Sequence, residues 1–131
     1  MPIEIRIAAF GALLLVVHIL VATQLTTSQY GAKWNIGARD DSVAPPTPIT
    51  GRMIRAQANF QETFPIAIVA LLGVVLAGKT SSSTALGGWI WLGARIVYIP
   101  LYAAGVPVAR TLTWGISIVG LAMVIWPLLA S

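Results

Sequence analysis

Long apolar stretches separated by short polar breaks dominate the chain. Four stretches stand out, at about residues 5–25, 52–77, 84–104 and 107–130. Each is long enough to cross a bilayer as a helix, which takes roughly 20 residues. The connections near 78–83 and 104–107 are short, so the helices that they join should run antiparallel. The pattern predicts an all-α integral membrane protein, a four-transmembrane-helix up-down bundle that forms one domain over residues 1–131.

The first connection, at about residues 26–51, is the only long one. It contains Gly31, Gly37, the pair Asp40-Asp41 and a proline-rich stretch at 45–48, all of which favour turns or extended chain. The apolar stretch before it is longer than the core of a secretory signal peptide, and no clear cleavage site follows. We therefore expect the first stretch to be a retained membrane span.

Composition supports the membrane assignment and excludes several other classes. Hydrophobic residues make up 57% of the chain and charged residues 9%, which is far from an ordinary soluble domain. The chain has no cysteine, so disulfides and thiolate metal sites are excluded. Its net charge of +4 comes from scattered residues rather than a basic run, which argues against a nucleic-acid partner.

The positive charges predict how the bundle is oriented. The first connection and its flanks carry Lys33, Arg39, Arg52 and Arg55, and Arg110 follows the third connection, whereas Arg6 and Lys79 fall on the opposite side. Positive residues favour the cytoplasmic face of a membrane. We expect the first and third connections to be cytoplasmic and both termini to lie on the other side.

The second apolar stretch begins with polar residues that the membrane span must include. The charge-free run at 64–77 is too short to cross a bilayer by itself, so the helix has to extend back over residues 55–63. Arg55, Asn59 and Glu62 then lie at or inside the membrane boundary, on one helical face at i, i+4 and i+7. Charged groups at that depth are costly unless they are paired or hydrated, so they indicate a functional site.

The third stretch repeats this pattern with Arg95, Tyr98 and Tyr102, and Arg110 opens the fourth. Because the second and third helices run in opposite directions, both polar sets fall in the same layer, roughly 10 Å deep at 1.5 Å per residue. Arginine and tyrosine donors suit an anionic ligand with carboxylates. Glu62 could bind an ammonium group or balance Arg95. His18 is the sole histidine, so a histidine metal cluster is absent.

Each of these residues also has a simpler interpretation. Arg55 could be a boundary residue that reaches the lipid headgroups. Arg95 and Glu62 could form a buried ion pair with only a structural role. Arg110 could be an ordinary cytoplasmic-side charge.

Two motifs resemble a known family. The sequence Arg-Ala-Gln-x-Asn-x-x-Glu-x-x-Pro at 55–65, preceded by Pro45-Pro46, is similar to a motif of the membrane-associated proteins in eicosanoid and glutathione metabolism (MAPEG). The spacing Ala-Arg-x-x-Tyr-x-x-x-Tyr at 94–102, followed by Arg110, resembles that family's second motif. The resemblance covers nearly the whole chain and is nearest to bacterial members.

The resemblance implies a homotrimer that binds glutathione as a cosubstrate between adjacent protomers, near the cytoplasmic side. By this resemblance, glutathione would be contacted by five residues: Arg55, Asn59, Glu62, Tyr98 and Tyr102. Arg95 would lie beneath the ligand, and Gln57 would contact the ligand site of the neighbouring protomer. Arg110 matches the arginine that stabilises the glutathione thiolate in the family's enzymes; a nearby cation lowers the pKa of a thiol.

The chain also departs from the family pattern. Thr63 stands where several family enzymes have tyrosine, and the spacing from Tyr102 to Arg110 differs by about one residue from some eukaryotic members. The leading hypothesis is a glutathione-dependent enzyme in the bacterial inner membrane that acts on a hydrophobic electrophile or lipid hydroperoxide, by transferase or peroxidase chemistry. The alternative is a non-catalytic lipid-binding or scaffold protein of the same fold. A small transporter has less support because the chain lacks an inverted repeat.

Overall fold

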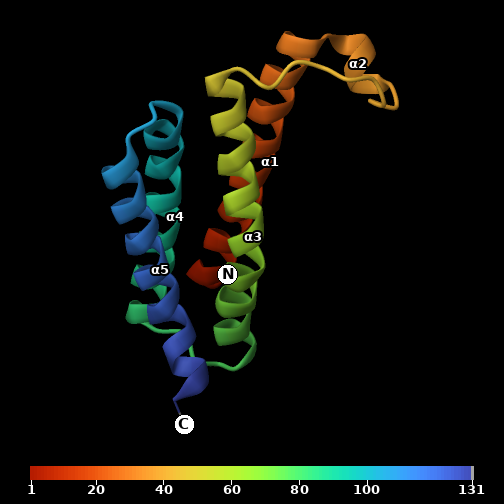
Figure 1. Ribbon diagram of the computed structural model, residues 1–131. Helices are drawn as coiled ribbons and strands as arrows, with labels where there is room; N and C mark the ends of the chain where they lie inside the picture. The colour runs from red at the N-terminus through yellow and green to blue at the C-terminus, as the bar shows by residue number, and fades with distance from the viewer. Residues whose placement is uncertain (131) are drawn as a thin grey trace.

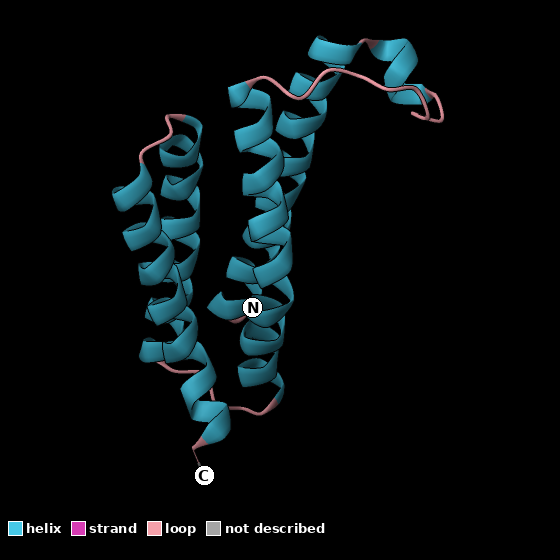
Figure 2. Cartoon of the chain, viewed as in Figure 1, coloured by secondary structure: helices cyan, strands magenta, loops and turns pink. Residues whose placement is uncertain are grey.

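The computed structural model describes residues 1–130 and contains helices but no strand within them (Figure 2). The helices are α1 (Ile3–Tyr30), α2 (Ala32–Ile36), α3 (Pro48–Leu76), α4 (Ser82–Ala103) and α5 (Pro107–Leu129). Within this described part, four helices are long and apolar enough to cross a membrane, and α2 is the exception. The predicted fold class, a four-helix membrane bundle, is therefore confirmed.

The bundle consists of two helix pairs, α1 with α3 and α4 with α5 (Figure 1). The α4–α5 turn and the long α1–α3 connection lie at one end, which we call the arginine end, and α2 projects sideways there (Figure 1). The α3–α4 turn lies at the other end, the terminal end. There the hydroxyl of Thr84 donates a hydrogen bond of 2.5 Å to the buried carboxylate of Glu4, which joins the beginnings of α1 and α4.

Local sequence signals explain where the helices begin and end. Pro48 occupies the first turn of α3, where its missing N–H costs nothing. Ser81 and Thr84 form a reciprocal capping box at the start of α4. Gly78 and Gly105 follow α3 and α4 with φ of 66° and 72°, a left-handed conformation that glycine adopts without steric cost.

The helices differ from the expected spans mainly at the first connection. α1 continues past residue 25 to Tyr30, α3 already begins at Pro48, and the short α2 was not predicted. An apolar run marks only the part of a helix that lies in the hydrocarbon core of the membrane, and the helix can continue beyond that run into polar residues. The side chains of Gln29 and Tyr30 donate hydrogen bonds to the carbonyls of Pro45 and Ala44, so the end of α1 holds the returning chain.

Two apolar clusters fill the interior. The larger is centred on the fully buried side chains of Phe60, Leu71, Trp91 and Leu121, from α3, α4 and α5. The smaller lies nearer the arginine end, where Met53 and Ala56 of α3 pack with Tyr98 and Tyr102 of α4. This smaller cluster fixes the rotation of α3 against α4, and thereby positions the polar face that each helix carries.

Two glycines allow α4 and α5 to pack backbone to backbone. A Cβ atom built on Gly120 would lie 2.5 Å from the carbonyl oxygen of Gly87 and 2.7 Å from the amide nitrogen of Trp91. A Cβ on Gly87 would lie 2.6 Å from the carbonyl oxygen of Gly120. Because the obstructing atoms belong to the backbone, a larger residue would have to separate the helices.

We expect Gly120→Ala to lower the free energy of unfolding by about 1–3 kcal/mol, the usual cost of overpacking. Gly93→Ala on α4 is the matched control, because a methyl group at Gly93 would meet no atom of residues 1–130 within 4 Å apart from its own stretch of helix, and alanine is the better helix former. Unfolding of both variants by sodium dodecyl sulfate in mixed micelles measures the difference. Equal stability of the two variants would contradict the close α4–α5 packing.

Candidate functional site

Two hydrogen bonds join the polar faces of α3 and α4. Arg55 Nε donates to the hydroxyl of Tyr102 at 3.3 Å, and Arg95 Nη2 donates to Asn59 Oδ1 at 2.8 Å. The two helices are antiparallel, so the earlier residue of α3 meets the later residue of α4. The structure thus brings together four of the residues that the sequence assigned to one polar layer.

Arg95 is the most buried member of this layer, with 1% of its surface exposed. Its guanidinium carbon lies 4.4 Å from the ring centre of Tyr98 and 5.3 Å from that of Phe60, so aromatic faces surround the charge. Within residues 1–130, its Nε and Nη1 atoms are buried without a hydrogen-bond partner. Arg95 therefore holds donors that water or a polar ligand could use.

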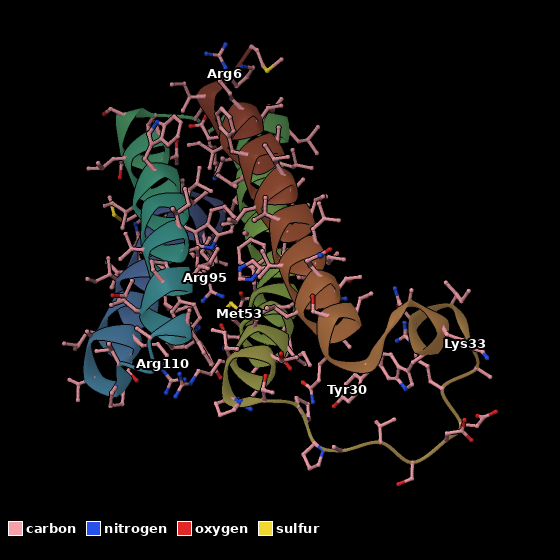
Figure 3. All side chains as sticks on the ribbon, turned by 90° about the horizontal axis from the view of Figure 1, so that it is seen from above. Arg6, Tyr30, Lys33, Met53, Arg95 and Arg110 are labelled. Atoms are coloured by element: carbon pink, nitrogen blue, oxygen red, sulfur yellow. The ribbon has the colours of Figure 1, made fainter. Side chains whose placement is uncertain are left out.

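Arg110 completes the layer from α5. Its guanidinium carbon lies 4.6 Å above the ring of Tyr102, whose hydroxyl is the group that accepts from Arg55. Tyr102 in turn packs edge-on against Tyr98, with ring centres 5.5 Å apart. Figure 3 shows Arg95 deep between the helices and Arg110 nearer the end of the bundle, while Arg6 lies at the opposite end.

Two cavities open on either side of Arg110. The first, which we call the arginine cavity, has a volume of about 210 Å³ and is lined by Arg52, Arg55, Tyr102, Gly105, Pro107 and Arg110. The second, the tyrosine cavity, has a volume of about 220 Å³ and is lined by Asn59, Tyr98, Arg110, Thr111 and Trp114. Arg110 lines both cavities, so its cation faces whatever occupies either of them.

Arg52 is a site residue that the sequence did not single out. It lines the arginine cavity, and its Nη1 donates to the carbonyl of Ala103 at 3.1 Å, at the end of α4. Its position three residues before Arg55, on the same helical face, is a signal that could have found it. Trp114 of α5 also lines a cavity.

Glu62 and Gln57 lie away from both cavities within one chain. The side chain of Glu62 is exposed on α3, and Arg95 pairs with Asn59, so the described residues contain no Arg95–Glu62 ion pair. Gln57 donates to Gln61 at 3.4 Å and faces a separate cavity beside α1 and the first connection. Both side chains are available to a neighbouring molecule.

Thr63 and His18 contact neighbouring groups of the protein and line neither of the two cavities. The Thr63 hydroxyl lies 3.2 Å from the carbonyl oxygens of Asn59 and Phe60, one turn earlier in α3. His18 is buried in α1 and stacks on Phe60 with ring centres 5.0 Å apart. Residues 1–130 contain no cluster of three His, Cys, Asp or Glu side chains that could hold a metal ion.

Fold and site together define an integral membrane helix bundle with a cationic, tyrosine-lined layer at one end. The sequence model of the MAPEG family matches residues 7–130, which is nearly the whole chain. The protein therefore belongs to the MAPEG family, whose members include glutathione-dependent transferases and peroxidases as well as non-catalytic proteins. Searches of curated proteins and of solved structures found no match to this chain.

Proposed function

We propose that this protein is a glutathione-dependent membrane enzyme that acts on a hydrophobic electrophile or a lipid hydroperoxide. The observation that carries the proposal is the position of Arg110, whose guanidinium lines two adjacent cavities and lies 4.6 Å above the Tyr102 ring. One cavity is rich in arginine and the other in neutral polar and aromatic groups. This division suits a ligand with an anionic part and a reactive part.

The residues present fit the chemistry of glutathione. The tripeptide carries two carboxylates, one ammonium group and a thiol. Arg52 and Arg55 line the arginine cavity with donors that suit carboxylates. Asn59 and Tyr98 line the adjoining tyrosine cavity, where the thiol would lie beside Arg110. The unpartnered donors of buried Arg95 lie beneath this layer.

A neighbouring protomer would complete the site. Neither cavity exceeds 220 Å³, whereas ligand pockets usually measure about 300–1,000 Å³. Glu62 is exposed and Gln57 faces away from both cavities, so each could reach a ligand held by an adjacent chain. We therefore propose a homotrimer with glutathione bound between protomers. The positive charges of the arginine end favour its placement on the cytoplasmic side of a bacterial inner membrane.

Arg110 would favour the thiolate form of bound glutathione and so supply the nucleophile. In a conjugation, the sulfur forms a bond to an electrophilic carbon and the leaving group departs with the bonding electron pair. In peroxide reduction, the thiolate attacks the hydroperoxide oxygen and releases an alcohol, and a second glutathione converts the sulfenic acid to a disulfide and water. The hydrophobic acceptor would enter the tyrosine cavity laterally from the bilayer.

One observation favours the non-catalytic alternative. The bonds Arg55–Tyr102 and Asn59–Arg95 link α3 directly to α4, as a purely structural polar layer would. A lipid-binding or scaffold protein would keep these bonds and show no thiol-dependent turnover.

Glutathione binding tests the proposal. We expect calorimetry on the purified, detergent-solubilised protein to show micromolar to millimolar affinity, and Arg55→Ala to weaken it at least tenfold because a charge-assisted contact is lost. Arg6→Ala is the matched control, since Arg6 lies at the opposite end of the bundle (Figure 3). An absence of binding by the unaltered protein would overturn the glutathione assignment in favour of the scaffold.

A further inference from the structure

An apolar groove lies between α1 and α4, on the membrane-spanning surface and apart from the polar layer. It has a volume of about 420 Å³ and is lined by Phe10, Leu13, Leu14 and Val17 of α1 and by Trp89, Leu92 and Ile96 of α4. Leu13 is 58% exposed and Ile96 is 50% exposed. The lining residues repeat at helical spacing on both helices, so the groove runs along the helix axes for roughly 10 Å.

A positive charge lies on the same stripe of α1, just beyond the groove. Arg6 precedes Phe10 by four residues, which places it one helical turn nearer the terminal end. Its side chain is exposed, and Figure 3 shows it at the end of the bundle opposite Arg110. From the membrane boundary towards the membrane interior, this face of α1 thus presents first the Arg6 cation and then a continuous apolar surface.

An aromatic pair marks the boundary between these two parts. The rings of Phe10 and Trp89 are 6.3 Å apart at the end of the groove nearest Arg6. Tryptophan is enriched at the level of the lipid headgroups. The order cation, aromatic pair and apolar groove corresponds to the order of headgroup phosphate, interface and acyl chain in a phospholipid.

We infer that this groove binds one anionic phospholipid of the leaflet at the terminal end. An acyl chain lies between α1 and α4, and the phosphate pairs with Arg6. An acyl chain gains dispersion contacts in a groove that would otherwise be poorly filled, and the arginine favours an anionic headgroup over a zwitterionic one. The site is separate from the proposed glutathione site and does not depend on it.

Native mass spectrometry of the detergent-solubilised protein tests the site, with equimolar phosphatidylglycerol and phosphatidylcholine as probes. We expect the unaltered protein to retain phosphatidylglycerol about fivefold more than phosphatidylcholine, roughly the effect of one arginine near an anionic lipid. Arg6→Gln should reduce this preference below about twofold. Lys33→Gln, an exposed cation on α2, is the matched control and should leave the preference unchanged.

Blocking the groove gives an independent test. Leu13→Trp should remove the retained lipid, whereas Leu112→Trp on α5, where the leucine is 64% exposed and outside the groove, should not. Ile96→Phe blocks the groove from the α4 side should the first variant fail to fold. Equal lipid retention by blocked and unaltered protein would overturn the inference. So would a loss of subunit association in Leu13→Trp without a loss of lipid, because the groove would then be a contact between copies of the chain.

Discussion

Replacing Arg110 with alanine is expected to lower thiol-dependent turnover by roughly 10²–10³-fold, the usual loss when one preorganised donor to a developing anion is removed. The guanidinium lines both cavities, and among residues 1–130 of the protomer no other cation does so. Of the two cavities, Arg52 and Arg55 line only the arginine cavity, so they cannot replace Arg110 beside the proposed position of the thiol. Turnover of glutathione with a broad electrophile and with a lipid hydroperoxide measures the effect.

The fold and the glutathione affinity should survive this substitution. Arg110 is half-buried and stacks on Tyr102, a contact worth about 1 kcal/mol at a partly exposed position. Arg110→Lys should retain part of the activity because it keeps a positive charge. Thr111→Val changes another residue of the tyrosine cavity and should have little effect. Undiminished turnover in Arg110→Ala would exclude the thiolate role.

Replacing Asn59 with leucine is expected to destabilise the bundle by about 3 kcal/mol. The substitution removes the acceptor 2.8 Å from Arg95 and leaves a guanidinium that is 1% exposed without this partner. A buried charge that loses its partner costs more than the hydrogen bond itself contributed. Unfolding of the variant in mixed micelles measures the loss.

A double-mutant cycle separates this explanation from simple loss of packing. Arg95→Met removes the charge, so Asn59→Leu in that background should cost less than about 1 kcal/mol. The double variant should fold but bind glutathione poorly, because both polar groups are gone. If Asn59→Leu is equally costly in both backgrounds, the Arg95–Asn59 bond does not stabilise the bundle.

The spanning helices and the shared polar layer could be predicted because both follow from periodicity. A stretch of roughly 20 apolar residues predicts a span, and the spacing of Arg55, Asn59 and Glu62 places them on one helical face. Antiparallel neighbours then bring Arg95 and Tyr102 to the same depth. These predictions need only the rise per residue and the direction of each helix.

The partner of each polar residue could not be predicted in this way. The sequence suggested Glu62 as a partner for Arg95, but Asn59 lies only three positions away, about 60° around an α-helix. The rotation of α3 decides between them. Met53, Ala56 and Phe60 pack into the interior, which aims Asn59 at α4 and leaves Glu62 exposed. Such packing depends on the shapes of several side chains at once.

The short α2 and the role of Arg52 escaped prediction for a different reason. α2 has five residues, too few for a periodic pattern, and its ends are set by local turns at Gly31 and Gly37. Arg52 was interpreted only as an orientation charge. Its place in the arginine cavity depends on the α4–α5 turn, where Gly105 and Pro107 close the cavity wall.

The proposed function depends above all on stabilisation of a glutathione thiolate by Arg110. The most direct measurement is the ultraviolet difference spectrum of the thiolate when glutathione is mixed with the protein. We expect a thiolate band that saturates with the calorimetric binding curve at neutral pH and is absent in Arg110→Ala, although that variant should still bind glutathione. Binding without a thiolate band in the unaltered protein, or an equal band in Arg110→Ala, would rule out this role of Arg110.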